Sequence, residues 1–389
     1  MLGNCSKPYG FVASHKYNLL IVASGLRIGG SEVVIKNLTQ HLDRRLFDVR
    51  VCHLKARGVI GDEIQRAGVD VIGIPQPKFF KTDYFTFLKL LKVIRRHKIN
   101  IVHSHTTHSL TDAAMCKLLS PGLRLVHTFH FGNYPHYKKR YMFMERVFGK
   151  VADRLVAVGD NQMETIKAAY RLRPTAIERI WNGITVSNNG EDVDLKSIIG
   201  SGRRFVIGTL GTLYDQKGIT YLLDVAATLK KRGEDVAFIV AGEGPLRREL
   251  EEKRERLGLT DSVFLVGWVK DAGARLLPHV DCFFQPSLWE AMSVVILEAM
   301  AAGKPIVATR VGENSKVIEH DRDGLLVNPC AVDQMAAALQ RLIRETATRD
   351  RLGREARRKF EETFTADRMA RKYERLYLDV LEDNGGRQA

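Results

Sequence analysis

Short apolar runs alternate along the chain with segments whose apolar residues recur at helical spacing. The runs are four to eight residues long, as expected for buried strands, and the longer segments predict helices between them. Strand-first alternation of this kind is typical of parallel sheets covered by helices on both faces. The predicted strands are residues 18–24, 47–54, 69–74, 100–103, 123–129 and 155–158, followed by 205–208, 236–241, 263–266, 282–284, 305–309 and 324–327. The fold class is therefore α/β, with doubly wound sheets.

The chain is long enough for two domains. It has 389 residues, which exceeds the size of an ordinary single core, and 45% of them are hydrophobic. Residues 187–204 are polar and contain glycine, so they are predicted to link a first domain (1–186) to a second (205–364). The end of the chain, 365–389, predicts an amphipathic helix that packs back on the first domain.

The composition argues against a membrane-spanning or disulfide-bonded protein. No apolar run approaches the length of a membrane span, and the first residues lack a signal-peptide core. The cysteines are odd in number and scattered, with no CxxC pair, so reduced thiols in the cytoplasm are expected. They are Cys5, Cys52, Cys116, Cys282 and Cys330.

The positive charge is concentrated in the first half. Residues 1–186 contain 29 Lys and Arg against 13 Asp and Glu, whereas the remainder contains 31 against 32. This asymmetry predicts an anionic partner for the first domain. Residues 78–98 form a basic amphipathic segment, which fits either peripheral binding to an anionic membrane or a helix packed on the sheet. The basic and aromatic stretch 133–141 fits either an acceptor cleft or an exposed loop. No nucleic-acid reader motif is present.

Two carboxylates flank a predicted helix start in the second half. Glu290 follows the strand 281–284, and Glu298 lies within the helix predicted from Ser293. The helix amino end between them offers unpaired N–H groups and a positive dipole. A ligand with a central diphosphate and hydroxyl groups at both ends would match this order of groups.

A second phosphate-capable turn lies near the start of the chain. The strand 18–24 leads through a glycine-containing loop into a helix, and Gly30 would let the backbone approach a phosphate closely. The glycines are Gly25, Gly29 and Gly30, so the spacing is not that of the dinucleotide fingerprint GxGxxG.

Histidines cluster at the ends of two predicted strands. His103, His105 and His108 suggest either a metal site or core and cleft histidines, and no nearby Cys or acidic residue completes a ligand set. His130 directly follows the strand 123–129, at the sheet edge where loops build sites.

The stretch from Glu290 carries a family resemblance. Glu290-x7-Glu298, continuing as EAMAAGKPIVATRVGENSKVIEHDRDGLLVNP, resembles the donor-site signature of the family 4 glycosyltransferases, the "glycosyl transferases group 1" type. The resemblance implies the GT-B fold, with two Rossmann-like domains facing across a cleft. It also implies transfer of a sugar from a nucleotide-diphosphate donor to an acceptor hydroxyl with retention of configuration.

The resemblance assigns expected roles to individual residues. Glu298 is expected to bind the ribose hydroxyls and Glu290 the sugar hydroxyls, while His130 assists beside the transferred sugar. The diphosphate is expected at Gly30, Lys217 and the amides near the helix start. The full donor-binding set is Gly30, Gly211, Thr212, Lys217, Glu290, Ser293, Val294 and Glu298, with His130, Glu290 and Lys217 as the catalytic residues.

Two positions depart from the family pattern. Thr212 stands where the family has arginine, so another cation is expected to compensate, for instance Arg27 or Arg310. Ala291 follows the first glutamate in place of the usual glycine, and its Cβ is expected to narrow the sugar pocket.

The sequence therefore predicts a metal-independent transferase without a cofactor, using a UDP- or GDP-sugar. A glycan or lipid-linked acceptor is expected, as in the synthesis of polysaccharide, lipopolysaccharide or glycolipid. Localisation in the cytoplasm or at the inner membrane face follows. Two alternatives remain open: a sugar-nucleotide epimerase of the same fold, and a catalytically silent scaffold that binds glycan or membrane.

Overall fold

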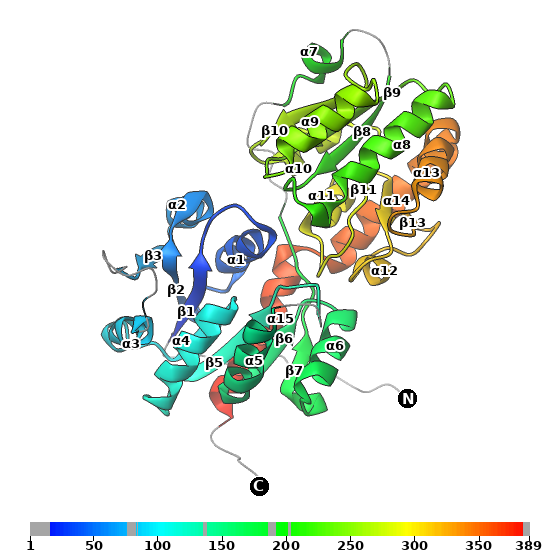
Figure 1. Cartoon of the computed structure of the whole chain (residues 1–389). Coiled ribbons are helices and arrows are strands. Elements are labelled where there is room, and N and C mark those ends of the chain that lie inside the picture. The colour runs from blue at the N-terminus through cyan, green and yellow to red at the C-terminus, as the bar shows by residue number, and fades with distance from the viewer. Residues whose placement is uncertain are drawn as a thin grey trace, which may run out of the picture.

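The computed structural model describes residues 16–75, 83, 85–134, 138–185, 192–200 and 204–383. It contains two parallel sheets, each covered by helices (Figure 1), so the predicted α/β class is confirmed. The first sheet has the strand order β3-β2-β1-β4-β5-β6-β7, and the second has the order β10-β9-β8-β11-β12-β13. The strands are nearly continuous apolar runs because helices cover them on both faces.

The element bounds follow the predicted alternation closely. The strands are β1 (Tyr17–Gly25), β2 (Phe47–Ala56), β3 (Asp70–Gly73), β4 (Ile101–Ser104), β5 (Arg124–Phe129), β6 (Arg154–Ala157), β7 (Ile177–Arg179), β8 (Phe205–Leu210), β9 (Val236–Ala241), β10 (Val263–Gly267), β11 (Cys282–Gln285), β12 (Ile306–Thr309) and β13 (Leu325–Val327). The helices are α1 (Gly30–His41), α2 (Gly58–Arg66), α3 (Thr86–Arg96), α4 (Thr107–Leu118), α5 (Lys139–Phe148), α6 (Asp160–Tyr170), α7 (Leu195–Ile199), α8 (Ile219–Lys231), α9 (Arg247–Arg256), α10 (Ala272–Arg275), α11 (Val294–Ala301), α12 (Asn314–Val317), α13 (Val332–Arg344), α14 (Thr346–Thr363) and α15 (Ala366–Glu382).

Each sheet has one point where the strand order reverses. In the first sheet this point lies between β1 and β4, and in the second between β8 and β11. Helices diverge to opposite faces at such a point and leave a crevice beyond the carboxyl ends of the strands. The loops after β1, β5, β8 and β11, which carry the residues predicted to be functional, therefore emerge at or beside these crevices.

The segment 78–98 has its apolar side turned inward. Leu90, Leu91 and Ile94 of α3 are buried in a core shared with α4, whereas Phe85 and Leu88 are 64% and 42% exposed. Tyr84, expected on the apolar face, lies outside the described residues. The main apolar side of α3 thus packs in the core, and only Phe85 and Leu88 at its edge are exposed to an external partner.

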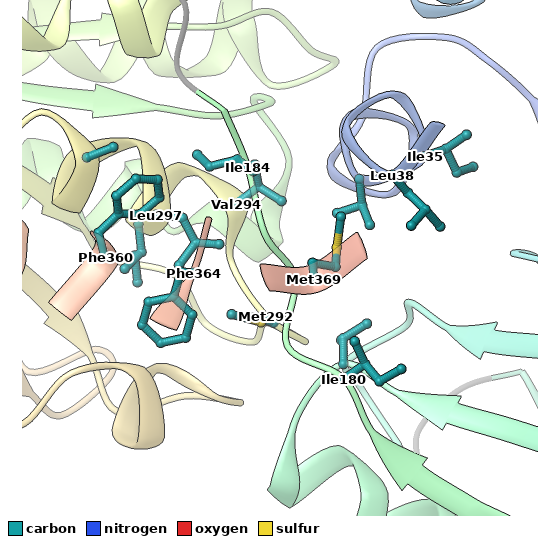
Figure 2. Close-up of a cluster of buried hydrophobic side chains, with 14 of the residues drawn as sticks. Ile35, Leu38, Ile180, Ile184, Met292, Val294, Leu297, Phe360, Phe364 and Met369 are labelled. Carbon is teal, nitrogen blue, oxygen red and sulfur yellow. The ribbon is translucent and has the colours of Figure 1, made fainter. Parts of the chain in front are cut away.

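The chain passes between the two sheets at 180–185 and again at 364–366. The two passing segments pair, since the Ile184 amide donates to the Phe364 carbonyl at 3.0 Å and the Ala366 amide to the Ile184 carbonyl at 3.1 Å. A Cβ at Gly183 would collide with the Thr365 carbonyl, so glycine permits this approach. Figure 2 shows the apolar side chains that surround the crossing, with Phe360 and Phe364 toward α11 and Ile35 and Leu38 on α1.

The last helix, α15, returns to the first sheet. It packs against α1 and β5 and buries Tyr373 and Tyr377. Residues 187–204, predicted as a linker, include the short helix α7, whose Leu195 is buried. Residues 187–191 and 201–203 of that segment lie outside the described part.

A buried carboxylate also joins the two halves. Glu313 accepts hydrogen bonds from the amides of Asp160 at 3.0 Å and Gln162 at 2.9 Å, so it satisfies the amino end of α6 from the opposite sheet. A Cβ at Gly159 would collide with the Glu313 side chain. The Asn161 amide group adds a bond of 2.8 Å to the Gly312 carbonyl. These contacts fix the first half against the loop that precedes α12.

Replacing Phe364 with alanine should destabilise the protein by about 3–5 kcal/mol, because a fully buried ring at the crossing is lost and leaves a cavity. Phe364 is 2% exposed and packs edge-to-face on Trp181. Urea unfolding followed by fluorescence measures the change. The matched control Phe85→Ala, at an exposed ring, should shift stability by less than about 0.5 kcal/mol. Equal effects of the two substitutions would contradict the packing role.

Candidate functional site

One cavity of about 730 Å³ lies between the carboxyl ends of the two sheets. Its walls come from both halves of the chain, and its size suits a ligand of a few tens of heavy atoms. It collects the predicted donor-binding and catalytic residues: Gly30, His130, Gly211, Thr212, Lys217, Glu290, Ser293, Val294 and Glu298. These residues are far apart in sequence, and the crossing of the chain between the sheets brings them together.

The amino ends of α1 and α11 meet in this cavity. A Cβ built on Gly30 would lie 3.6 Å from the Cγ2 of Val294, so a larger residue at Gly30 would touch Val294, and the glycine leaves that space open between the two helix starts. Neither helix has a side-chain cap, and the Ser293 hydroxyl instead accepts a bond from the Gln285 amide group at 2.6 Å. The first-turn N–H groups and the positive dipole ends of both helices are therefore available to an anion at one place.

Lys217 and Glu290 form a partly buried ion pair beside these helix starts. The Lys217 Nζ lies 2.6 Å from Oε1 of Glu290, and the Ser287 hydroxyl donates to the same oxygen at 2.8 Å. Lys217 ends the 3-10 turn η3 (Asp215–Lys217), directly before α8. Glu290 is 6% exposed, so its charge depends on these two partners, and Lys217 is held in place near the helix ends.

Glu298 lies within α11, about one helical turn after Val294. Its side chain faces α10, where a Cβ at Gly273 would come within 2.8 Å of its carboxyl carbon. Burial raises the pKa of Glu298 to about 7, and the nearby Lys36 partly opposes this shift. No hydrogen-bond partner of the Glu298 carboxylate is found within the described ranges, so both oxygens are free to bind hydroxyl groups of a ligand.

The cavity contains a cation that the sequence analysis did not single out. Neither Arg27 nor Arg310 lines the cavity, so the expectation that one of them replaces the missing arginine is wrong; both lie on exposed turns. Lys36, on the inward side of α1, does line it and pairs with Glu63 at 3.0 Å. Lys36 lies six residues after Gly30 within α1, and the sequence does not distinguish such a lysine from the lysines that point to solvent.

Glu32 places a carboxyl group in the first turn of α1. It accepts a hydrogen bond from the Ser31 hydroxyl at 2.7 Å. Burial raises the pKa of the Glu32 carboxyl group, so its neutral form is favoured more than in water. An anion bound near Glu32 therefore meets less electrostatic repulsion.

His130 enters the cavity from the end of β5. Its Nε2 lies 2.8 Å from Nδ1 of His105, and the two rings are nearly parallel. Burial lowers the pKa of His130 to about 4, so the ring is neutral near pH 7. His103 is held by Tyr377 and Thr128, and His108 packs on Tyr141.

The loop that carries His130 is anchored on both sides. Tyr134 donates to the buried Glu145 at 2.7 Å, and Tyr170 donates to the same oxygen at 2.6 Å. A Cβ at Gly132 would collide with the backbone of Glu290 and Ala291. The glycine thus lets the His130 loop lie directly on the loop that carries Glu290 and Ala291. Residues 135–137 of the basic stretch 133–141 lie outside the described part.

Trp268 is a cavity residue that the sequence analysis missed. It follows β10, lines the cavity and is 49% exposed. A flat apolar surface open to a ligand is suited to stacking a planar ring. The only sequence signal was a lone tryptophan after a predicted strand, which also fits a core position.

No group of three His, Cys, Asp or Glu residues with the spacing of a metal site occurs among the described residues. None of the described helices is both long and apolar enough to cross a bilayer. The four described cysteines are free.

Comparison with known proteins agrees with this geometry. The family model described as "Glycosyltransferase Family 4" matches residues 28–188, and the model "Glycosyl transferases group 1" matches residues 194–359. Together they span most of both halves. The epimerase alternative gains no support, since the models that match describe transferases.

Named relatives resemble the chain over about two thirds of its length. It is 27% identical over 273 residues to the Escherichia coli UDP-Gal:alpha-D-GlcNAc-diphosphoundecaprenol alpha-1,3-galactosyltransferase, covering 67% of this chain and 70% of that one. It is 28% identical over 293 residues to the alpha-D-kanosaminyltransferase of Streptomyces kanamyceticus, covering 69% and 74%.

A solved structure shares the whole architecture. Anabaena HepE, crystallised with UDP, superposes with a TM-score of 0.80 at 20% identity, covering 93% of this chain and all of that one. The two family models, the fold and the cavity between the sheets agree: the chain belongs to the family 4 glycosyltransferases of the group 1 type and has the GT-B fold.

Proposed function

We propose that the protein transfers a sugar from a nucleotide-diphosphate sugar to a hydroxyl group of a glycan or lipid-linked acceptor, with retention of configuration. One observation carries this proposal. The uncapped amino ends of α1 and α11 and the Lys217 ammonium converge in a cavity that has Glu290 on one side and Glu298 on the other. Such a row of groups matches a sugar, a diphosphate and a ribose in order.

The donor is oriented by hydrogen bonds at both ends. Glu298, with two unpartnered oxygens, accepts the two ribose hydroxyls, and Glu290 accepts hydroxyls of the sugar. Because Gly273 contacts Glu298, the base extends from the ribose along the loop between β10 and α10, where Trp268 offers a stacking surface. The base of the donor is uracil by analogy with the UDP that HepE binds.

Charge stabilisation of the leaving diphosphate supplies the main rate enhancement. As the glycosidic bond breaks, negative charge grows on the phosphate that faces Lys217 and the first amides of α11. These groups are fixed before the reaction, so no reorganisation is needed. The lysine and the two helix ends provide this positive charge without a cofactor.

Retention follows from the way Glu290 is engaged. A double displacement needs a free carboxylate as nucleophile. The Oε1 of Glu290 is bound by Lys217 and Ser287, which makes this carboxylate a poor nucleophile. The leaving phosphate instead takes the proton of the acceptor hydroxyl on the same face of the sugar, and the new glycosidic bond forms on that face.

The acceptor side is consistent with a lipid surface. Exposed apolar side chains occur on α3, α4 and α5, which lie beside one another in the first half (Figure 1). Exposed basic residues accompany them, so the surface combines apolar anchors with charge complementary to an anionic bilayer. The apolar set is Phe85, Leu88, Leu118, Leu119, Phe143 and Val147, and the basic set is Lys92, Arg95, Lys139, Arg140 and Arg146. The proposed location is the cytoplasmic face of a membrane that holds the acceptor.

The proposal is tested by thermal-shift screening of UDP-, GDP- and ADP-sugars, followed by incubation of the stabilising donor with a bacterial lipid extract and mass spectrometry of the products. The expected result is stabilisation by one donor class and a lipid or glycan whose mass rises by one hexose-type unit, also in the presence of EDTA. Conversion of the donor to an epimer, or vesicle binding without donor binding, would contradict the proposal.

Glu298→Gln should raise the donor KM by about 10–100-fold while kcat changes less, because hydrogen bonds to a charged group contribute about 1.5–3 kcal/mol. Initial rates over a donor concentration series measure this effect. Glu249→Gln, at an exposed position on α9, is the matched control and should leave KM unchanged. An unchanged KM in Glu298→Gln would remove the ribose assignment.

The same residue should make stability depend on pH. In the unfolded chain the Glu298 carboxyl loses its proton near 4.5, whereas the folded protein holds it until about pH 7. The folded state therefore binds more protons between these values, and this contribution to stability declines as the pH rises through them. Thermal unfolding of the unliganded protein from pH 4.5 to 7.5 should show a shallower decline for Glu298→Gln than for the Glu249→Gln control.

The combined substitution Phe143→Ser and Leu118→Ser should weaken binding to phosphatidylglycerol-containing vesicles about tenfold, because two exposed anchors lose their apolar contact with the bilayer. Vesicle sedimentation at low and high salt measures the binding, which salt should weaken. Leu257→Ser, at a 37% exposed leucine in the second half, is the control. Equal binding to neutral and anionic vesicles would contradict the proposed surface.

A further inference from the structure

His105 is buried and contacts the cavity histidine rather than the cavity itself. It directly follows β4, is 2% exposed, and lies 2.8 Å through its Nδ1 from Nε2 of His130. The other ring nitrogen of His105, Nε2, is buried and has no hydrogen-bond partner. The reaction proposed above uses His130 but assigns nothing to His105.

The unpartnered nitrogen determines which histidine donates. A neutral imidazole carries one proton, so the single bond between the rings has two possible directions. If His130 donated, His105 would need its own proton on Nε2, which would leave a buried N–H without an acceptor. If His105 donates from Nδ1, its Nε2 is only a lone pair. Buried unpaired donors are the rarer and costlier case, so the second direction is favoured.

Both rings are neutral, as this argument requires. Burial lowers the pKa of His130 and, further, that of His105, and the neighbouring His103 and His127 act in the same direction. The groups facing the pair are these two histidines on β4 and β5, while Lys217 and Glu290 neutralise each other across the cavity. No carboxylate contacts either ring among the described residues, so neither imidazolium form is stabilised.

The C-terminal helix holds this arrangement from behind. The Tyr377 hydroxyl and the Thr128 hydroxyl lie 2.6 Å and 2.7 Å from the two ring nitrogens of His103, so both of its nitrogens are engaged. Tyr373 is 3.0 Å from the same Thr128 hydroxyl. The His103 ring, thus fixed, packs 4.0 Å from the His105 ring, centre to centre. The orientation of His105 is therefore set by packing from β4, β5 and α15.

We propose that His105 is a positioning residue that fixes the tautomer of His130, so that His130 presents an Nδ1–H donor to the transferred sugar or to the departing phosphate. The role rests on the proposed function, because it concerns the same donor site. An N–H at this point favours negative charge as it develops, whereas a bare nitrogen would oppose it. Sequence reasoning saw His105 only as part of a histidine-rich strand end.

The kinetic test uses His105→Leu and His105→Asn, with His130→Ala as reference. Leucine fills a similar volume but cannot donate, so kcat should fall about 10–100-fold with a donor KM within about threefold of the wild type. Asparagine can place an amide N–H near the former Nδ1 and should restore kcat to within about fivefold. Wild-type kcat in His105→Leu would overturn the proposal.

A double substitution separates positioning from a purely structural role. If His105 acts through His130, the variant carrying both His105→Leu and His130→Ala should be no slower than His130→Ala alone. Losses that multiply would show that His105 acts independently of His130 and would overturn the proposal. Thermal unfolding of each variant checks that the fold is kept.

The tautomer of His130 can be determined by NMR without measuring transferase activity. Long-range ¹⁵N–¹H correlation spectra of the ¹⁵N-histidine-labelled wild-type chain, assigned with the His130→Ala variant, should show His130 protonated on Nδ1 at pH 7.5. In His105→Leu the Nε2-protonated form should appear. Protonation of His130 on Nε2 in the wild type would contradict the inference, even if a sugar is transferred. The expected spectrum without transfer would instead count against the proposed function alone.

Discussion

The approach of the amino ends of α1 and α11 to one another is the constraint on which the site depends. Each helix belongs to a different sheet, and each leaves its first-turn amides without a side-chain cap. The positive ends of the two helix dipoles repel each other, so an anion bound between Gly30 and Val294 would stabilise this approach. The two chain crossings and the α15 return supply the packing energy that holds the helices there.

Desolvation governs the other charged groups of the cavity. Glu290 is hydrogen-bonded by Lys217 and Ser287, whereas Glu298 has no such partner and burial raises its pKa to about 7. The histidines on β4 and β5 are neutral for the same reason: burial disfavours the imidazolium form and no carboxylate compensates. The site therefore has positive charge where the diphosphate is expected, and a neutral histidine beside the Lys217–Glu290 pair where the sugar is expected.

Sequence patterns predicted much of the fold because both sheets consist of short apolar strands separated by amphipathic helices. β7 was missed, since its three residues, Ile177–Arg179, are too few to show a period. The short helix α7 was missed because its polar surroundings are typical of a linker. The basic segment 78–98 shows another limit: its periodicity predicts a helix, but whether the apolar side faces the core or a membrane depends on the neighbouring α4.

The cavity residues that belong to a recognisable sequence motif could be predicted. Those that reach the cavity only because the chain folds that way could not. Glu290, Lys217 and His130 were found because each lies after a strand end or just before a helix, and Glu298 was found from its spacing to Glu290 in the family signature. Lys36 reaches the cavity from the side of α1. Gly273 is important only because the Glu298 side chain lies against it, and Trp268 belongs to no sequence motif. The wrong expectation for Arg27 and Arg310 has the same origin, since proximity in sequence to a phosphate turn does not determine where a long side chain points.

A crystal structure of the full chain with UDP should show the diphosphate between Gly30 and Val294, within hydrogen-bond distance of the first amides of α11 and of the Lys217 ammonium. The ribose hydroxyls should lie on Glu298. A diphosphate bound elsewhere, with Glu298 turned toward solvent, would contradict the proposed site.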